Sequence, residues 1–372
     1  MIINGTSYCS LEDLEEDAFA RIEAGALGYL KSGSESETTL RLNREQFSTV
    51  RFIPRVLIDV SRVSTESQIL GRPVPVPIMI APMAMQRLVH ADGECAMSRG
   101  ALAKNVPMIL STMSTSSMKD VVETNNPNLL FQLYCLKDRD VVRRMVEEAE
   151  RFGFRGLVLT VDAPRLGKRE SDEKQQFSLP DTMHLEILKT HGITHGCSND
   201  ASASLQSKFG REFSNLIDDS LTWDIIPWLK SITKLPIIVK GILSKEDAIL
   251  AVKHKVDAIV VSNHGGRQLD HAIPTLQALA RIAPRIRNKG VEIWVDGGIR
   301  RGSDVVKCLC LGAHAVLIGR PFLWSLCLGG SSGVSAALTS IQQDVERTMA
   351  LLGCNSVSQL YKKRDSFILY RE

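Results

Sequence analysis

Residues 262–270, Ser-Asn-His-Gly-Gly-Arg-Gln-Leu-Asp, follow the apolar run 258–261 and combine side chains that could do acid–base chemistry on a small anion. A short β-branched run before a polar turn with glycines indicates a buried strand that ends in a loop. His264 can exchange a proton near neutral pH, Arg267 offers a planar fork for a carboxylate, and Gly265 and Gly266 allow the backbone to approach a flat ligand. Each residue alone is also typical of a solvated loop, so a site is predicted only if other loops contribute.

Eight short apolar runs of this kind recur from residue 77 onwards, at 77–82, 107–112, 129–134, 156–162, 236–241, 257–262, 291–296 and 314–319. Segments with helical spacing lie between most of them, including 138–152, 245–254, 302–311 and a closing helix at 334–352. Eight strand-and-helix units are typical of a (β/α)₈ TIM barrel, because doubly wound sheets more often have fewer strands. We expect one α/β domain spanning residues 1–372.

The first 70 residues predict a helical extension. Ser10-Leu11-Glu12-Asp13 is a capping-box pattern, and apolar residues follow it at helical spacing, at positions 14, 18, 22 and 26. The glycines at 28 and 33 predict a helix break, with another short helix near 40–47. Tyr29 falls in that break, where it could either pack under a loop or serve the site.

More than seventy residues separate Asp162 from Pro236, where the other runs are far closer together. The polar part of this insertion, 166–215, predicts a lid loop, because long loops in compact barrels tend to cover the site. Since it follows the fourth run, it should lie over the same mouth as residues 262–270.

Polar residues end the predicted strands, at Tyr134, Asp162, Lys240 and Asp296. Each could be an ordinary polar residue of a barrel layer, but the carboxyl ends of barrel strands meet at one face, where catalytic residues are found. After the last two runs come the Gly and Arg residues of a possible phosphate site: Gly297, Gly298, Arg300, Gly319 and Arg320. Barrels commonly bind phosphate between these loops, although the same residues could make turns and surface charges.

Composition narrows the function classes. A net charge of +3 without a long basic run gives no basis for binding nucleic acid or an anionic membrane, and no apolar run reaches membrane-spanning length. Eight cysteines without a spaced framework favour a reducing compartment, and the carboxyl terminus lacks a Ser-Lys-Leu type signal for peroxisomes, so a cytoplasmic enzyme is expected, with a peroxisomal one as the alternative. His184, His191, His195 and Cys197 lack the spacing of a metal site, and Cys308 and Cys310 predict core packing; no metal is expected.

Several motifs resemble the FMN-dependent L-2-hydroxy acid oxidases and dehydrogenases, a family that includes glycolate oxidase, lactate oxidase and the flavin domain of flavocytochrome b2. The similarity runs nearly end to end. It is carried by residues 51–55, 80–84, 131–134, 159–167, 239–241, 262–268, 296–302 and 318–321. The Ser-Asn-His-Gly-Gly-Arg-Gln motif is specific to this group.

The resemblance implies a role for each matched residue. His264 would be the base, Asp162 would pair with its imidazolium, and Lys240 would place a cation beside the flavin as negative charge develops there. Arg267 and Arg169 would hold the substrate carboxylate, and the hydroxyl groups of Tyr29 and Tyr134 would also contact the substrate. Tyr134 would in addition be a catalytic residue. The FMN site would comprise Ala84, Ser111, Gln132, Thr160, Lys240, Ser262, Asp296, Gly297, Gly298, Arg300, Gly319 and Arg320.

Three positions depart from plant glycolate oxidases. Met113 stands where they have a Trp over the pocket, Leu30 where they have a second Tyr, and Met83 where a Thr is common. A flexible Met leaves more adaptable space than a Trp. We therefore expect Met113 to contact substrate and the pocket to accept substrates longer than glycolate.

The expected function is FMN-dependent oxidation of an L-2-hydroxy acid to a 2-oxo acid, that is, an (S)-2-hydroxy-acid oxidase. Oxygen is the expected acceptor, giving hydrogen peroxide, because no haem-binding domain precedes the barrel. A dehydrogenase with another acceptor, a non-redox barrel isomerase that binds a phosphorylated metabolite, and an inactive scaffold remain as alternatives. The resemblance also implies a homotetramer.

Overall fold

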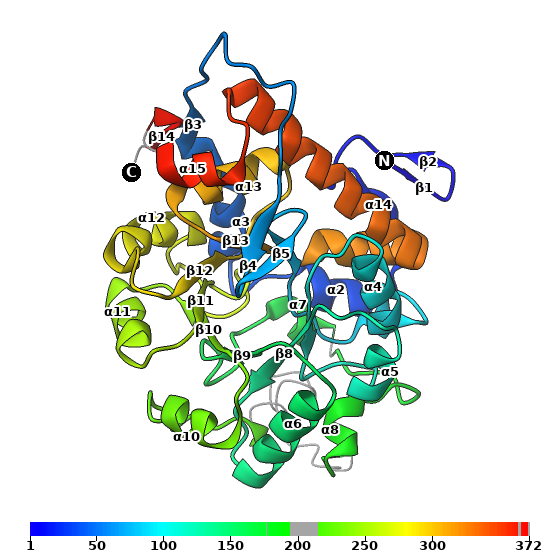
Figure 1. Cartoon of the computed structure of the whole chain (residues 1–372). Helices are drawn as coiled ribbons and strands as arrows, with labels where there is room; N and C mark the ends of the chain where they lie inside the picture. The colour runs from blue at the N-terminus through cyan, green and yellow to red at the C-terminus, as the bar shows by residue number, and fades with distance from the viewer. Residues whose placement is uncertain (176, 194–214, 364–365, 371–372) are drawn as a thin grey trace.

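A closed barrel of eight parallel strands lies at the centre of the molecule (Figure 1). The computed structural model describes residues 1–175, 177–193, 215–363 and 366–370. The strands follow one another around the barrel in chain order and fall on the eight predicted runs: β6 (Ile78–Ile80), β7 (Met108–Ser111), β8 (Leu129–Tyr134), β9 (Leu157–Thr160), β10 (Ile237–Ile242), β11 (Ala258–Val261), β12 (Glu292–Val295) and β13 (Ala315–Ile318). The predicted TIM barrel is confirmed.

The barrel strands are apolar on both faces because each face is covered. Inside the barrel, Met79, Val158, Val260, Trp294 and Leu317 belong to one buried cluster. The alternate residues of the same strands face the surrounding helices in a second, larger cluster. A hairpin of β4 (Ser67–Ile69) and β5 (Arg72–Val74) adds two apolar side chains to the interior cluster. Burial on both faces explains why these strands appear in the sequence as continuous apolar runs.

Helices surround the barrel: α4 (Gly93–Leu102), α5 (Met118–Val122), α6 (Arg139–Arg151), α10 (Ile225–Ile232), α11 (Lys245–Lys253), α12 (Thr275–Ile286), α13 (Gly302–Leu311), α14 (Arg320–Leu352) and α15 (Val357–Lys363). The last strand of the chain, β14 (Ile368–Tyr370), lies outside the barrel and pairs with β3 (Val50–Phe52). The predicted helices 138–152, 245–254 and 302–311 are confirmed within one residue. The predicted closing helix, 334–352, corresponds to the part of α14 after a kink at Gly329 and Gly330. A further helical part, which begins at Arg320, precedes the kink and was not predicted.

α14 is also the one helix of the described residues that is long and apolar enough to cross a membrane. Of its most apolar window, 61% is buried inside the protein. It packs against α4 and α13, as expected for a core helix of a barrel.

The amino-terminal extension is helical, but the predicted break is in the wrong place. After α1 (Leu14–Arg21) the chain becomes extended at Ile22, and α2 (Ala24–Lys31) begins with the Glu23 carboxylate accepting a hydrogen bond from the amide of Ala26. Gly28, Tyr29 and Leu30 therefore lie inside α2, which ends only at Ser32. Gly28 does not end the helix. A glycine is needed there for close packing, because a Cβ would lie 2.4 Å from the side chain of Gln175.

The remaining boundaries near the amino terminus also shift. Ser10 binds the Asp13 carboxylate through its amide and hydroxyl, yet α1 starts after Asp13, so Ser10 is not the helix cap. Two short strands, β1 (Ile2–Ile3) and β2 (Thr6–Ser7), precede it. α3 (Thr38–Glu45) begins two residues before the predicted helix and continues into the 3₁₀ turn Gln46–Thr49; a second such turn spans Gln86–Leu88.

α3 starts early because a residue distant in sequence caps it. Asp270 accepts hydrogen bonds from the amides of Thr38 and Thr39 and from the hydroxyl of Ser36. Burial raises the pKa of Asp270, but these hydrogen bonds outweigh it and bring the pKa well below its usual range. The contact fixes α3 against the loop after β11, and local sequence around residue 38 contains no sign of it.

The described part of the predicted lid is folded against the barrel mouth. Residues 166–193 contain α7 (Glu170–Lys174) and α8 (Glu186–Thr190). Gln268 holds the start of this segment by donating to the carbonyls of Asp162 and Arg165 and accepting from the amide of Gly167. The rest of the predicted loop, 194–214, lies outside the described residues.

Candidate active site

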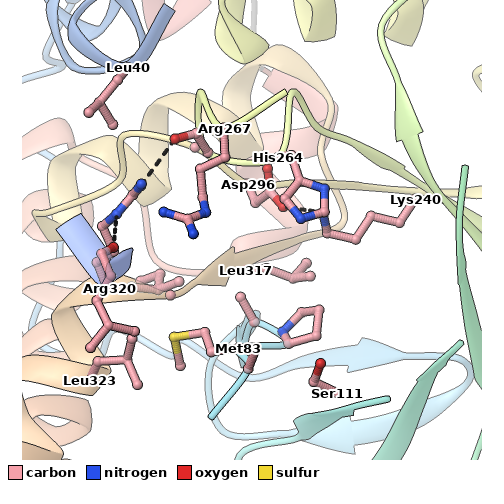
Figure 2. A pocket seen from close by; sticks show the side chains of 18 of the residues that line it. Leu40, Met83, Ser111, Lys240, His264, Arg267, Asp296, Leu317, Arg320 and Leu323 are labelled. Carbon is pink, nitrogen blue, oxygen red and sulfur yellow. Dashed lines mark hydrogen bonds and ion pairs between the residues drawn. The ribbon is translucent and has the colours of Figure 1, made fainter. Parts of the chain in front are cut away.

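Nearly all predicted site residues line one cavity at the carboxyl ends of the barrel strands. The cavity contains about 1250 Å³ of space, counting the solvent at its open mouth. Figure 2 shows His264, Arg267 and Arg320 on one side of it and Met83 and Ser111 on the other. Only Asp162 and Ser262 of the predicted set do not line the cavity wall. Both lie directly behind it and contact residues that do.

His264 and Asp162 form a hydrogen-bonded pair. Nδ1 of His264 lies 2.9 Å from Oδ1 of Asp162, which leaves Nε2 facing the cavity, 3.5 Å from the hydroxyl of Tyr134. Burial lowers the pKa of His264 below its usual value, and Asp162 opposes this only in part. Burial raises the pKa of Asp162, but the charges of His264 and Lys240 outweigh it, so the net shift is downward. A neutral imidazole beside a carboxylate can accept a proton and keep it.

The loop that carries His264 depends on an unusual backbone. His264, Gly265 and Gly266 all have positive φ, at 59°, 64° and 75°. A Cβ on Gly266 would lie 2.6 Å from the backbone of Leu40 in α3, so only glycine permits this approach. The turn is thus pressed between α3 and the barrel, which directs the imidazole toward the cavity.

Ser262 connects three site residues from behind the cavity wall. Its buried hydroxyl accepts hydrogen bonds from Nζ of Lys240, at 3.0 Å, and from the amide of His264, and donates to Asp296 at 2.9 Å. Burial lowers the pKa of Lys240, but Asp296 and Asp162 raise it by more than burial lowers it. The ammonium group therefore remains charged at the cavity wall.

A hydrogen-bonded row crosses the mouth of strands β7, β8 and β9. Ser111 donates to the side-chain oxygen of Gln132, and the amide nitrogen of Gln132 donates to Thr160 at 3.0 Å. Ser111 and Gln132 are paired in register, which explains how the row arises from adjacent strands. Together with Ala84 and Lys240, these residues line the cavity floor and offer polar atoms to a flat ligand.

Two arginines from different segments meet at Tyr29. The guanidinium carbons of Arg267 and Arg169 lie 4.9 and 5.7 Å from the centre of the Tyr29 ring. Arg267 donates to the carbonyls of Tyr29 and Ser32 at the end of α2. Burial and the charge of Arg169 lower the pKa of Arg267 to about 10, so it stays a cation at neutral pH. Burial raises the pKa of Tyr134, which remains a hydroxyl.

The predicted phosphate loops line the same cavity, and their Arg320 shares the carbonyl of Ser32 with Arg267. Gly297 and Gly298 have positive φ, and a Cβ on Gly298 would lie 2.0 Å from the carbonyl oxygen of Asn43. Arg320 begins α14 after Gly319 and donates to the carbonyls of Leu30, Ser32 and Gly265. Arg300 pairs with Glu15 at 3.2 Å. Burial lowers the pKa of both arginines, and other arginines close by lower it further. For Arg320 the pKa lies well below its usual value.

The three departures from the glycolate oxidase pattern all line the cavity. Met113, Leu30 and Met83 are buried in the protein, at 3%, 6% and 9% exposure, and face the open space together with Leu166 and Leu323. This part of the wall is apolar and contains flexible thioethers, which can adjust to ligands of different length.

Four residues that support the site were not assigned by sequence. Asn43 exchanges amide hydrogen bonds with Asn263 at 2.8 Å in both directions, and Asp270 caps α3. Phe177 stacks on Tyr29 at 4.6 Å between ring centres. Asp172, in α7, lies 3.8 Å from Arg169. An Asn inside a helix, such as Asn43, is a weak signal for a specific contact. The contacts of Asp270 and Phe177 join distant segments and leave no local pattern. Arg169 and Asp172 are only three residues apart, but their burial depends on other segments.

The other candidate clusters have different roles. His191 binds the carbonyl of Ile187 and pairs with Glu148, and His195 and Cys197 lie outside the described residues. Among the residues that the structure describes, no group of three or more His, Cys, Asp or Glu side chains could hold a metal. Cys308 and Cys310 are buried free thiols in α13, which confirms core packing.

Comparisons with known proteins agree on one family. The family description "FMN-dependent dehydrogenase" matches residues 18–366. The chain is 43% identical to the L-lactate oxidase of Nostoc sp., over 95% of this chain and 97% of that protein. It is 44% identical to glycolate oxidase 1 of Zea mays, over 91% and 90%. A crystal structure of mandelate oxidase with (S)-4-hydroxymandelic acid superposes with a TM-score of 0.90 at 37% identity, covering 95% of this chain and 98% of that one.

Proposed function

Because the chain belongs to the family of FMN-dependent dehydrogenases, we propose that it oxidises an L-2-hydroxy acid to the 2-oxo acid, with oxygen as acceptor and hydrogen peroxide as second product. Relatives named as lactate, glycolate and mandelate oxidases support this activity. The single structural observation that carries it is the His264–Asp162 pair beside Arg267 in one cavity. Membership of this family excludes the non-redox isomerase.

The residues around the cavity fit the cofactor FMN. In the described part of the chain, Arg320 is a partly buried guanidinium with carbonyl partners but no ion pair, and it lies at the amino terminus of α14. A partly buried cation of this kind calls for an anion such as a phosphate. Ser111, Gln132, Thr160 and Lys240 would hold the ring, and Arg300, Gly297, Gly298, Gly319 and Arg320 the phosphate. Bound FMN supplies the chemistry that accepts two electrons and a hydrogen from the substrate and passes them to oxygen.

The protein's own residues then handle the proton and the substrate's charge. His264 takes a proton from the substrate at Nε2, since Nδ1 is engaged by Asp162. Asp162 stabilises the imidazolium that results, because an opposite charge nearby favours the protonated ring. Lys240, fixed by Ser262 and Asp296, keeps a positive charge at the cavity wall throughout. Such a preorganised charge stabilises negative charge that develops during the reaction.

The substrate carboxylate would bind at the arginine end. Arg267 is held in place by two backbone carbonyls and keeps further N–H groups for a ligand. Arg169 lies next to it over Tyr29. The hydroxyl of Tyr134, 3.5 Å from His264, would bind the 2-hydroxyl group beside the base. This arrangement fixes the reacting carbon relative to His264, which is how orientation lowers a barrier.

A substrate screen tests both the reaction and the length of the substrate. We expect purified protein to bind FMN and to be reduced anaerobically by L-lactate or (S)-2-hydroxyoctanoate faster than by glycolate, because Met113, Met83 and Leu30 leave an adaptable apolar wall. Admitting oxygen should restore the oxidised spectrum and produce hydrogen peroxide. Protein that takes up no FMN would refute the function. A strong preference for glycolate would refute only the proposed length, and slow reoxidation by oxygen would favour a dehydrogenase.

We also propose that the protein assembles as a homotetramer. The loop after β3 projects from the molecule (Figure 1) and exposes Val56, Leu57 and Ile58 at 79%, 102% and 41%. Adjacent exposed apolar residues of this kind are typical of association surfaces. We expect light scattering to give the mass of four chains and Leu57→Glu to reduce it, because the substitution would bury a charge. Ile249→Glu, on α11, serves as the control; a monomeric wild-type protein would contradict the proposal.

Two proposals concern organisation and location. We propose that residues 1–372 form one domain, which the packing of α3 on the loop after β11 supports. A cytoplasmic location is supported by the seven described cysteines, all of them free thiols. Limited proteolysis and cell fractionation test these proposals: a stable separate fragment would contradict the first, and recovery in peroxisomes the second.

A further inference from the structure

Asp172 is a buried carboxylate that the proposed reaction does not use. It lies in α7, at the start of the insertion, and is 5% exposed. Its Oδ2 is 3.8 Å from Nη1 of Arg169, and the charge of Arg267 also acts on it. Neither Oδ1 of Asp172 nor Nε of Arg169 has a hydrogen-bond partner. A charge buried at such cost normally compensates another charge.

The balance of charge around the cavity shows what Asp172 compensates. Five basic side chains each have a carboxylate within 4 Å: Lys240 with Asp296, His264 with Asp162, Arg300 with Glu15, Arg44 with Glu12 and Arg169 with Asp172. Over the described ranges, Arg267 and Arg320 have no such partner. Arg320 lies with the proposed phosphate loops. At the substrate end, Arg267 and Arg169 carry two positive charges, and Asp172, which interacts with both, supplies one negative charge. One positive charge is therefore left for a ligand.

Building on the proposed function, we propose that Asp172 is a specificity-determining residue that restricts the enzyme to 2-hydroxy acids with one carboxylate. Its negative charge offsets one of the two positive charges of Arg267 and Arg169, so that a single net positive charge faces the substrate. One carboxylate on the substrate balances Arg267. A second carboxylate would enter a poorly solvated region in which the nearest arginine already has its anion.

The positions of the two arginines make the exclusion effective. Both guanidinium groups lie over the ring of Tyr29, so a second substrate carboxylate near Arg169 would also lie near Asp172. Like charges in a site of low dielectric repel strongly. Without the charge of Asp172, Arg169 would have its fork free for a second carboxylate. Burial raises the pKa of Asp172 and the two arginines offset this only in part, so the comparison belongs at mildly alkaline pH, where the carboxyl is most ionised.

A pair of ligands with the same shape isolates the charge. (S)-Malate and its β-amide, (S)-2-hydroxysuccinamate, differ by one negative charge, and their ratio of kcat/KM cancels general effects on folding or flavin content. We expect the wild-type enzyme to prefer the amide and Asp172→Asn to reduce that preference about tenfold or more. Asp172→Glu should keep it. Asp181→Asn, the same change at an exposed position of the insertion, should leave the ratio unchanged.

Each outcome decides the proposal. An unchanged ratio in folded Asp172→Asn overturns it. If that variant does not fold, the wild-type enzyme still provides a test, since equal use of malate and its amide also overturns it. Where neither compound is turned over, their inhibition constants against L-lactate oxidation give the same ratio. If the protein oxidises no 2-hydroxy acid at all, the proposed function is refuted. That result differs from an unchanged malate-to-amide ratio, which refutes only the role of Asp172.

Discussion

His264→Gln is expected to retain FMN and to lose substrate-driven reduction by about 10² to 10⁴-fold, because removal of a proton by a positioned base contributes roughly that factor. Glutamine occupies a similar volume and can still donate to Asp162, but it cannot accept a proton at neutral pH. Stopped-flow absorbance under anaerobic conditions measures the step directly. Unimpaired bleaching by this variant would remove His264 from the role of base. His271→Gln, at a side chain that is 70% exposed, is the matched control.

The pH dependence provides a second test of the same assignment. The base must be neutral to accept a proton, so kcat/KM should rise as pH increases through the pKa of His264 and be flat above it. Burial lowers that pKa below its usual value of about 6.5, so the limb should lie on the acid side of pH 6.5. Asp162 raises the pKa. Asp162→Asn should therefore move the limb to still lower pH; a limb above pH 7 in the wild-type enzyme would contradict the environment described here.

The barrel could be predicted from sequence because its signals are local. A strand buried on both faces must be apolar throughout, and several of the runs end at a polar residue that lines the cavity, as at Tyr134, Lys240 and Asp296. Gln132 and Lys240 are examples: each comes directly after three apolar residues of its strand, and its position in the strand places it at the cavity. The location of the site residues could be predicted for the same reason, because residues at the carboxyl ends of parallel barrel strands meet at one face whatever segments connect the strands.

The amino-terminal extension and the insertion could not be predicted in the same way, because their structure depends on contacts between distant segments. Gly28 suggests a helix break by local preference, yet packing against Gln175 explains a glycine within α2. Asp270 starts α3 from more than two hundred residues away. The pairing of Asp172 with Arg169 is only three residues apart, but its burial depends on α2 and on the loop after β11. A sequence pattern gives the charge of such a residue and not its surroundings.

The second large effect is expected for Arg267→Met, which should lower kcat/KM for L-lactate by about 10² to 10³-fold, because loss of one partner of a desolvated charge pair typically costs 2–5 kcal/mol. Most of the loss should appear in KM, since the arginine binds the carboxylate in the ground state as well as in the transition state. Steady-state kinetics and anaerobic titration of the flavin spectrum measure both terms. Arg165→Met, at a side chain that is 84% exposed, is the control.

Arg267 also has a structural role, which the experiment must separate from binding. Its Nη1 joins the carboxyl-terminal end of α2 to the loop after β11 through the carbonyls of Tyr29 and Ser32. Lactamide, which lacks the carboxylate charge, distinguishes the two: loss of carboxylate binding should reduce the preference for L-lactate over L-lactamide, whereas a disturbed site would reduce both equally. Arg267→Lys should recover only part of the preference, because an ammonium group cannot bond the carboxylate and both carbonyls in the same planar fork. Equal losses for acid and amide would assign the carboxylate to a residue other than Arg267.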